Sequence, residues 1–177
     1  LKDFPYIGID DRNAMCDATR YVISHQYQRL IYISPPLSYT DMNIEVQLER
    51  FRGFQSVVEN APVEAVVIKD YDYLAAVDKL QLVHSKKTAF LCSSDVYSLD
   101  LVRHMKRKGL SAPYDYGVLG FDNIDTLQYV EPLISTISVP IRDIGRRAVE
   151  ILAAGIAGQP MNSKHLPYEI ITGQTII

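Results

Sequence analysis

The feature that most constrains the fold of this sequence is a regular alternation of short apolar runs with amphipathic segments of helical period between residues 5 and 121. No tight hairpin turn separates consecutive apolar runs. Strands that follow one another in parallel need a crossover, usually a helix, before the chain can rejoin the sheet. The alternation therefore predicts an α/β fold built on a doubly wound parallel sheet.

The element boundaries follow from apolar periodicity, prolines and glycines. We expect strands at residues 5–10, 29–34, 63–68, 88–92, 116–121, 134–139 and 166–171. We expect helices at about residues 13–25, 45–59, 73–84, 95–107 and 140–157. Asn13 is the expected cap of the first helix, and Val46, Phe51, Phe54 and Val58 are the expected inward positions of the second.

Charge and motif content argue against several classes of function. A net charge of −3 disfavours a nucleic-acid-binding surface, which is normally basic. No apolar run approaches the ~20 residues that span a bilayer, and no signal peptide is visible. The two cysteines, Cys16 and Cys92, follow no metal spacing, and neither a phosphate loop nor a GxSxG elbow is present. We therefore expect no enzyme activity, metal or cofactor.

Polar residues stand where several of the predicted strands end, and this edge is where ligands bind in open α/β sheets. They are Asp10, Ser34, Lys69 with Asp70, Ser93 with Ser94, and Asp122. The carboxylate of Asp122 can accept two hydrogen bonds from a ligand. The alternative is that Asp122 and Asn123 only form a turn, and the spacing favours the two interpretations about equally.

Arg50 lies in the first turns of a predicted helix and can point to the same crevice. Its guanidinium offers five donors in a fixed fork, while Tyr71, Tyr73 and Tyr97 can pack on an apolar ligand face. Together these groups indicate a site for a small polar molecule such as a sugar or nucleoside. The alternatives are that Arg50 pairs with a glutamate of its own helix and that Ser94 only caps one.

Several ordered motifs carry a family resemblance. The segment PYIGIDDRNAMCDATRYVISHQYQRLIYIS, the ERFRGFQ helix start, FLCSSDVYSLDLVRHMKRKGLSAPYDYGVLGFDNID and PLISTISVPIRDIGRRAVEIL follow one another along the chain. In this order they resemble the effector-binding core of the LacI/GalR transcriptional repressors, and more distantly the periplasmic sugar-binding proteins. The resemblance runs nearly end to end.

The resemblance implies two subdomains that close on a small ligand. Residues 13–134 form the C-terminal, effector-binding subdomain, and residues 161–177 contain the strand that returns to it. Residues 1–12 and 135–160 belong to an N-terminal subdomain that is only partly present. The family's helix-turn-helix and first βα units, which would precede Leu1, are absent from this sequence, so operator DNA would be bound only through that missing part.

The resemblance also implies roles for single residues. Arg50 and Asp122 match the family's effector contacts, as fork donor and bidentate acceptor. Ser94 stands where many sugar-responsive members have an asparagine, and Tyr71 or Tyr73, beside Asp70, replaces an aromatic residue that stacks on the ligand.

The resemblance places a homodimer interface on Leu127 and Tyr129, together with Leu99 and Arg103 on the outer face of helix 95–107. The expected function is that of an effector-sensing, dimerising domain of a cytoplasmic LacI-type regulator. The alternatives are a periplasmic or surface solute-binding protein of the same fold and, last, an enzyme with a doubly wound sheet.

Overall fold

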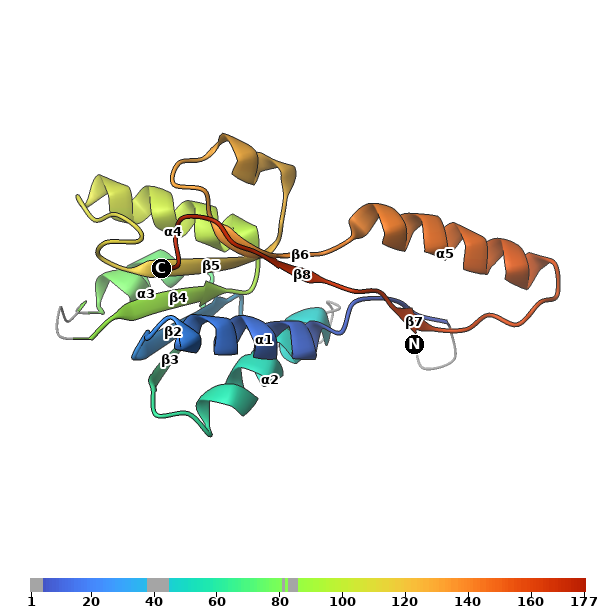
Figure 1. Cartoon of the computed structure of the whole chain (residues 1–177), viewed down its shortest axis with the longest axis horizontal. Coiled ribbons are helices and arrows are strands. Elements are labelled where there is room, and N and C mark those ends of the chain that lie inside the picture. Colours follow the sequence, from blue (N-terminus) through green and yellow to red (C-terminus); the bar gives the residue numbers. More distant parts are fainter. Residues whose placement is uncertain (1–4, 38–44, 81, 83–85) are drawn as a thin grey trace.

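A six-stranded sheet forms the centre of the computed structural model, which describes residues 5–37, 45–80, 82 and 86–177. The strand order is β3-β2-β4-β5-β6-β8 (Figure 1). The strands are β2 (Arg29–Ser34), β3 (Glu64–Lys69), β4 (Thr88–Cys92), β5 (Gly117–Asp122), β6 (Ser135–Ser138) and β8 (Glu169–Ile171). The first five pair in parallel, whereas β8 pairs antiparallel with β6. The predicted doubly wound parallel sheet is confirmed, with β8 as its antiparallel edge.

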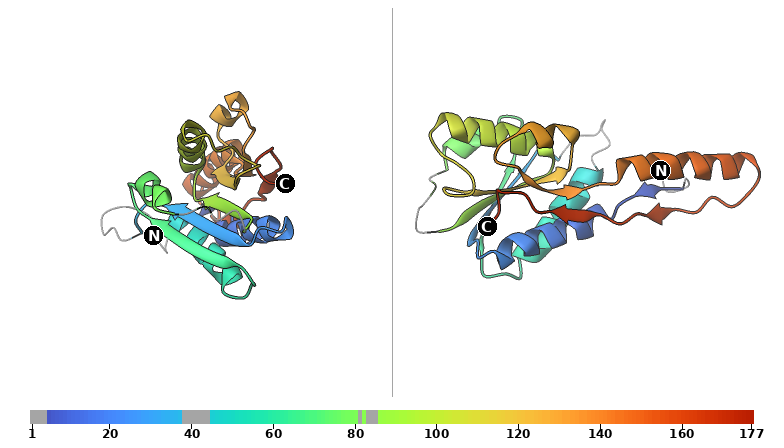
Figure 2. Two further views of the ribbon diagram at one scale, coloured as in Figure 1. Left: turned by 90° about the vertical axis from the view of Figure 1, so that its left-hand side faces the viewer. Right: turned by 45° about the horizontal axis from the view of Figure 1, so that its top comes forward.

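Helices cover both faces of this sheet (Figures 1 and 2). On one face α1 (Asp11–Ser24) and α2 (Glu45–Val58) pack against Leu30 and Tyr32 of β2. On the other, α3 (Tyr73–Asp78) and α4 (Asp95–Arg107) pack against Ile31 and Ile33. Because successive side chains of a strand point to opposite faces, the continuous apolar run of β2 supplies both cores at once.

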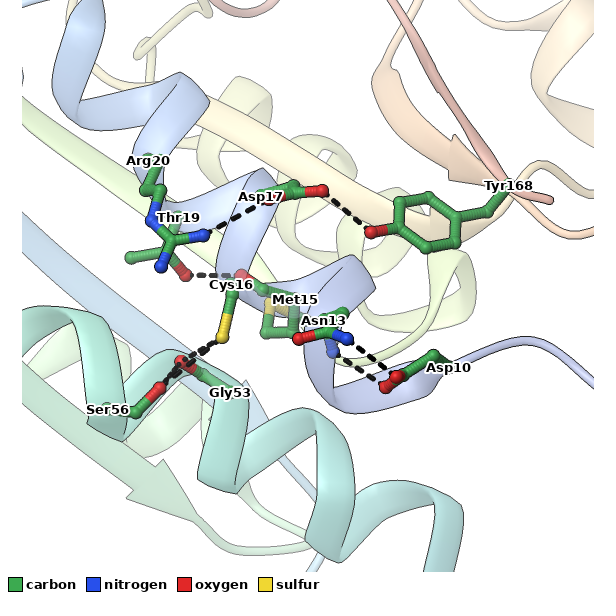
Figure 3. A network of polar contacts seen from close by, with 10 residues as sticks. All are labelled: Asp10, Asn13, Met15, Cys16, Asp17, Thr19, Arg20, Gly53, Ser56 and Tyr168. Atoms are coloured by element: carbon green, nitrogen blue, oxygen red, sulfur yellow. Dashed lines mark hydrogen bonds and ion pairs between the residues drawn. The ribbon is translucent and has the colours of Figure 1, made fainter. Parts of the chain in front are cut away.

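The two helices α1 and α2 approach each other closely at Gly53, where a Cβ would clash with the backbone carbonyl of Arg12. The Cys16 thiol lies 3.4 Å from the Gly53 carbonyl oxygen and donates to it (Figure 3). At the other side of α1, the Tyr168 hydroxyl donates to Asp17 over 2.7 Å. The glycine thus sets the distance between the helices, and Arg50, one turn earlier in α2, faces α1.

Three helical expectations need correction. The cap of α1 is Asp10, whose carboxylate accepts from the Asn13 amide at 2.9 Å, because the helix begins at Asp11 (Figure 3). Val46 is exposed rather than inward, since it lies in the first turn of α2. Helix α3 ends at Asp78, and the amides of Lys79 and Leu80 donate hydrogen bonds to carbonyls three residues earlier in the chain. The predicted end near 84 falls outside the described residues.

A smaller part extends away from the sheet (Figures 1 and 2). Here β1 (Ile7–Gly8) pairs in parallel with β7 (Lys164–His165), and α5 (Ile141–Ile156) lies alongside. Helix α5 begins after Pro140, as predicted, and Gly158, with a φ of 72°, follows its end. None of the residues of α5 is buried. The strand β7 was not predicted, because two exposed polar residues carry no strand periodicity.

Candidate functional site

The side chain of Arg50 is the centre of a polar network at the carboxyl ends of the strands, and the residue is only 6% exposed. Its Nε donates to Oδ1 of Asp11 at 2.8 Å, and its Nη1 donates to the Ser93 carbonyl at 2.7 Å. The same Nη1 lies 3.0 Å from Oδ1 of Asp122. The arginine therefore joins α2 to the start of α1 and to the ends of β4 and β5.

The planar guanidinium also lies on an aromatic ring, with its carbon 3.7 Å from the Phe121 centroid. A buried cation over a ring face gains stabilisation from the ring quadrupole. The alternative that Arg50 pairs with a glutamate of its own helix is wrong. Glu45 and Glu49 pair with Arg52 instead, on the exposed side of α2.

Asp122 ends β5 in an unusual backbone conformation, with φ of 110°, and Asn123 follows with φ of 55°. Positive φ values in non-glycine residues are costly and occur mostly where surrounding contacts enforce them. The Asp122 carboxylate is held from both sides, by Arg50 on Oδ1 and by the Ser94 hydroxyl on Oδ2 at 2.9 Å. Its side chain remains 28% exposed, so the carboxylate is fixed in direction but reachable.

Ser94 occupies the cap position of α4, but its side chain makes no capping hydrogen bond. The hydroxyl is directed to Asp122 instead, so the interpretation of Ser94 as a cap alone is wrong. The sequence predicted that Arg50, Ser94 and Asp122 lie at one edge of the sheet. In the structure Asp122 contacts both Arg50 and Ser94 in one polar network.

Two further carboxylates of this region were not among the predicted site residues. Burial raises the pKa of Asp11, and the positive charge of Arg50 opposes the shift. Asp95, the first residue of α4, is fully buried, and burial raises its pKa to about 6. Asp11 could have been suspected as a second acid after the first strand, and Asp95 as the residue following the two serines.

A hollow of about 630 Å³ adjoins the exposed side of this network. Its wall on the sheet side includes Asp122, Asn123 and Ser138, and its opposite wall is the segment from Pro140 to Asp143 at the start of α5. A second hollow, of about 320 Å³, lies near Tyr27 and Tyr116 and shares no residue with the network. Of these two hollows, the first is therefore the one from which a small molecule can reach Asp122.

The remaining predicted ligand contacts lie in other surroundings. Asp70 accepts a hydrogen bond from the Asp72 amide within its own turn, at 2.9 Å, and Tyr71 is exposed. Tyr73 is buried, and its hydroxyl donates to Asp100 over 3.1 Å, while its ring packs against that of Tyr97. The structure thus places Tyr73 and Tyr97 in packing contacts, and ligand contact by Asp70 or Tyr71 stays a prediction.

The residues predicted for a dimer interface differ in accessibility. Tyr129, at the end of the 3-10 helix η1 (Asp125–Tyr129), is 81% exposed. Arg103 is exposed and pairs with Asp100 at 3.1 Å. Leu99 is partly buried against the α4 core, and Leu127 is 2% exposed. Only Tyr129 and Arg103 offer most of their side chains to a partner.

Within the described ranges, no group of three or more histidine, cysteine, aspartate or glutamate side chains is arranged to hold a metal ion. Among the helices that the structure describes, none combines the length and the apolar character needed to cross a membrane.

Sequence comparison finds repressors of transcription. The chain is 29% identical over 168 residues to the HTH-type transcriptional repressor CytR of Escherichia coli K12, covering 91% of this chain and 48% of CytR. It is 30% identical over 140 residues to the HTH-type repressor PurR of Aliivibrio fischeri, covering 73% of this chain and 42% of PurR. The chain thus spans about half the length of the curated relatives it matches or less.

Structural comparison gives the same fold. A LacI family regulator from Enterococcus faecium with bound ribose superposes with a TM-score of 0.80 at 21% identity, covering 97% of this chain and 64% of that one. The transcription regulator CcpA of Lactococcus lactis gives a TM-score of 0.81 at 22% identity, covering 99% and 66%.

The family description "periplasmic binding protein-like domain" matches residues 19–176, which include α2, β5 and the Arg50–Asp122 network. The resemblance inferred from the motifs is confirmed: this chain belongs to the family of periplasmic binding protein-like domains, and its relatives are LacI-type transcriptional repressors.

Proposed function

We propose that this chain is the effector-sensing and dimerising domain of a LacI-type transcriptional regulator. The observation that carries the proposal is the fixed but reachable Asp122 carboxylate, oriented by Arg50 and Ser94 beside a hollow that could hold a small ligand. The similarity to CytR and PurR, both named as HTH-type repressors, supports a regulator over a periplasmic or surface solute-binding protein.

The charges of the site favour a ligand rich in hydrogen-bond donors. Arg50 carries one positive charge between the carboxyl groups of Asp11 and Asp122, so with both ionised the three groups sum to −1. Arg50 is only 6% exposed and does not line the hollow, whereas Asp122 does, so the Asp122 carboxylate is the main group of this network offered to the hollow. Hydroxyls of a sugar or nucleoside suit such acceptors, whereas a phosphate would be repelled.

The proposed division into subdomains and the proposed dimerisation rest on the same similarity to transcriptional repressors. Residues 13–134 and 161–177 would form the effector-binding subdomain, and residues 1–12 and 135–160 would form part of the second one. Dimerisation through Tyr129, Arg103, Leu99 and Leu127, of which Tyr129 and Arg103 are exposed, would let effector occupancy bias DNA binding elsewhere in a longer cytoplasmic protein.

A thermal-shift screen against sugars, nucleosides and amino acids tests the proposal, because ligand that binds only the folded state raises the melting temperature. We expect a sugar or nucleoside to bind and Asp122→Ala to weaken its binding by about 5-fold to 150-fold, roughly 1–3 kcal/mol. Calorimetry would measure the loss, and circular dichroism would show that the variant is folded.

Arg52→Met is the matched control for Arg50→Met, because both arginines lie on α2 but Arg52 is exposed and pairs with Glu45 and Glu49 of its own helix. Arg50→Met should lose binding, and Arg52→Met should retain it. A ligand that binds Asp122→Ala as tightly as the unchanged chain would refute this site.

A further inference from the structure

Asp95 is a buried carboxylate that the ligand network does not touch directly, although it lies one residue after Ser94. Its Oδ2 accepts the backbone amide of Ile124 at 3.0 Å, and its Oδ1 accepts the hydroxyl of Thr136 at 2.7 Å. The residue is 0% exposed. One carboxylate thus ties the start of α4 to β6 and to the turn that follows Asp122.

The hydrogen bond from Ile124 to Asp95 lies next to the strained backbone of Asp122 and Asn123. Asp122 and Asn123 both have positive φ, and Ile124 is the first residue after them. Such a backbone persists only where neighbouring contacts fix it. The Asn123 side chain adds one contact, a hydrogen bond of 3.1 Å from Nδ2 to the Ser138 hydroxyl, but that pair is exposed. The contact between the Ile124 amide and Asp95 is part-buried, so it is better shielded from water than the Asn123 pair.

Gly120 explains how the carboxylate reaches this position. A Cβ on Gly120 would clash with Oδ1 of Asp95, so the glycine opens the surface of β5 to the acid. Glycine inside a strand weakens it unless a close approach requires the space. Gly120 of β5 thus leaves the space through which the Asp95 carboxylate of α4 reaches Thr136 of β6.

We propose that Asp95 is a positioning residue that holds the turn from Asp122 to Ile124 in the geometry that points the Asp122 carboxylate at the ligand. The proposal rests on the proposed function for its ligand, but its structural part does not.

The protonation of Asp95 supplies a readout for this role. Burial is the main cause that raises its pKa to about 6, the hydrogen bonds from Thr136 and from the backbone of Ile124 and Asn123 oppose the shift, and the charge of Asp122 adds to it. The titratable groups that face it are Asp122 at the end of β5 and the Cys92 thiol at the end of β4. A protonated Asp95 offers Ile124 a weaker acceptor, because a charged acceptor binds more strongly than a neutral one.

Nuclear magnetic resonance of the full chain tests the structural part without any ligand. We expect the Ile124 amide resonance to shift with a midpoint near pH 6 and the shift to be absent in Asp95→Asn. We expect Asp95→Ala to raise hydrogen exchange at the Ile124 amide at least tenfold relative to the amides of β4. Thr136→Val, which removes the other anchor of the carboxylate, should raise the same exchange if Asp95→Ala fails to fold.

Ser98→Ala is the matched control. Ser98 is buried on the same helix and its hydroxyl donates to the Asp95 carbonyl, not to the turn. It should leave Ile124 exchange unchanged. An Ile124 amide that neither titrates nor exchanges faster in the variants would overturn the proposal, as would equal acceleration of all sheet amides.

Binding of D-ribose and adenosine, measured by calorimetry, tests the functional part. A probe that binds the unchanged chain should bind Asp95→Ala at least tenfold more weakly, with Asp95→Asn in between. Unchanged affinity in Asp95→Ala would overturn the proposal. If neither probe binds the unchanged chain, that result counts against the proposed function rather than against Asp95, and the Ile124 measurements alone then decide the role of Asp95.

Discussion

The helices α4 and α5 have similar sequence patterns and opposite surroundings. Both are amphipathic and close to four turns long, yet α4 buries Leu101, Val102 and Met105 against the sheet, while α5 buries no residue. Among the described elements, the short strands β1 and β7 lie beside α5, and a two-stranded sheet offers too little surface to cover a helix. The comparison shows that an apolar stripe predicts a helix, whereas its burial depends on what the chain places opposite.

Truncating one leucine on each helix is the sharpest way to test this difference. Leu101 of α4 is 0% exposed, and Leu152 of α5 is 62% exposed. Leu101→Ala should lower the free energy of unfolding by about 2–5 kcal/mol, because it removes buried methyl groups and leaves a cavity. Leu152→Ala should change it by less than about 0.5 kcal/mol. Urea denaturation measures both, and equal losses would show that α5 is covered in solution.

The pH dependence of stability tests the buried acid of the large sheet. The folded-state pKa of Asp95 is raised above its unfolded value of 3.8, so the folded chain binds this proton more tightly than the unfolded chain does. The resulting contribution to the free energy of unfolding is fully present below pH 3.8. The contribution is lost as the pH rises through about 6. Relative to Asp95→Asn, the unchanged chain should therefore lose about 2 kcal/mol of stability between pH 4 and pH 7.

Asp143→Asn, a change on the exposed surface of α5, is the control for that measurement. It should leave the slope of stability against pH unchanged over the same range. Parallel curves for the unchanged chain and Asp95→Asn would contradict the assignment of Asp95.

A glycine in α2, which packs on the large sheet as α4 does, and a glycine in α5 should respond to alanine with opposite changes in stability. Gly53→Ala in α2 should destabilise the chain by about 1–3 kcal/mol, because its Cβ would meet the Arg12 carbonyl. Gly145→Ala in α5 meets nothing within 4 Å and should stabilise the chain by about 0.5–1 kcal/mol through helix propensity. Thermal unfolding measures the stability of both variants. Destabilisation by Gly145→Ala would indicate that Gly145 packs against a neighbour in solution.

Much of the fold was predictable because the strands are apolar runs whose ends are marked by local signals. The same signals located Asp122, Ser94 and Arg50. Asp11 and Asp95 were missed as members of the site, because their roles depend on partners 29 to 41 residues away in the chain. The glycine within β5, Gly120, was the available signal, since an interior strand glycine often marks a close approach.

The backbone at Asp122 also decides where this site can change. A φ of 110° restricts position 122 to residues that tolerate positive φ, chiefly glycine, asparagine and aspartate. Replacement by glycine deletes the carboxylate, and replacement by asparagine removes its charge. Ser94, by contrast, has an ordinary extended backbone, with φ of −156° and ψ of 153°, which any residue adopts. Under the proposed function, a lineage or an engineer seeking a new ligand preference would therefore keep position 122 and vary position 94.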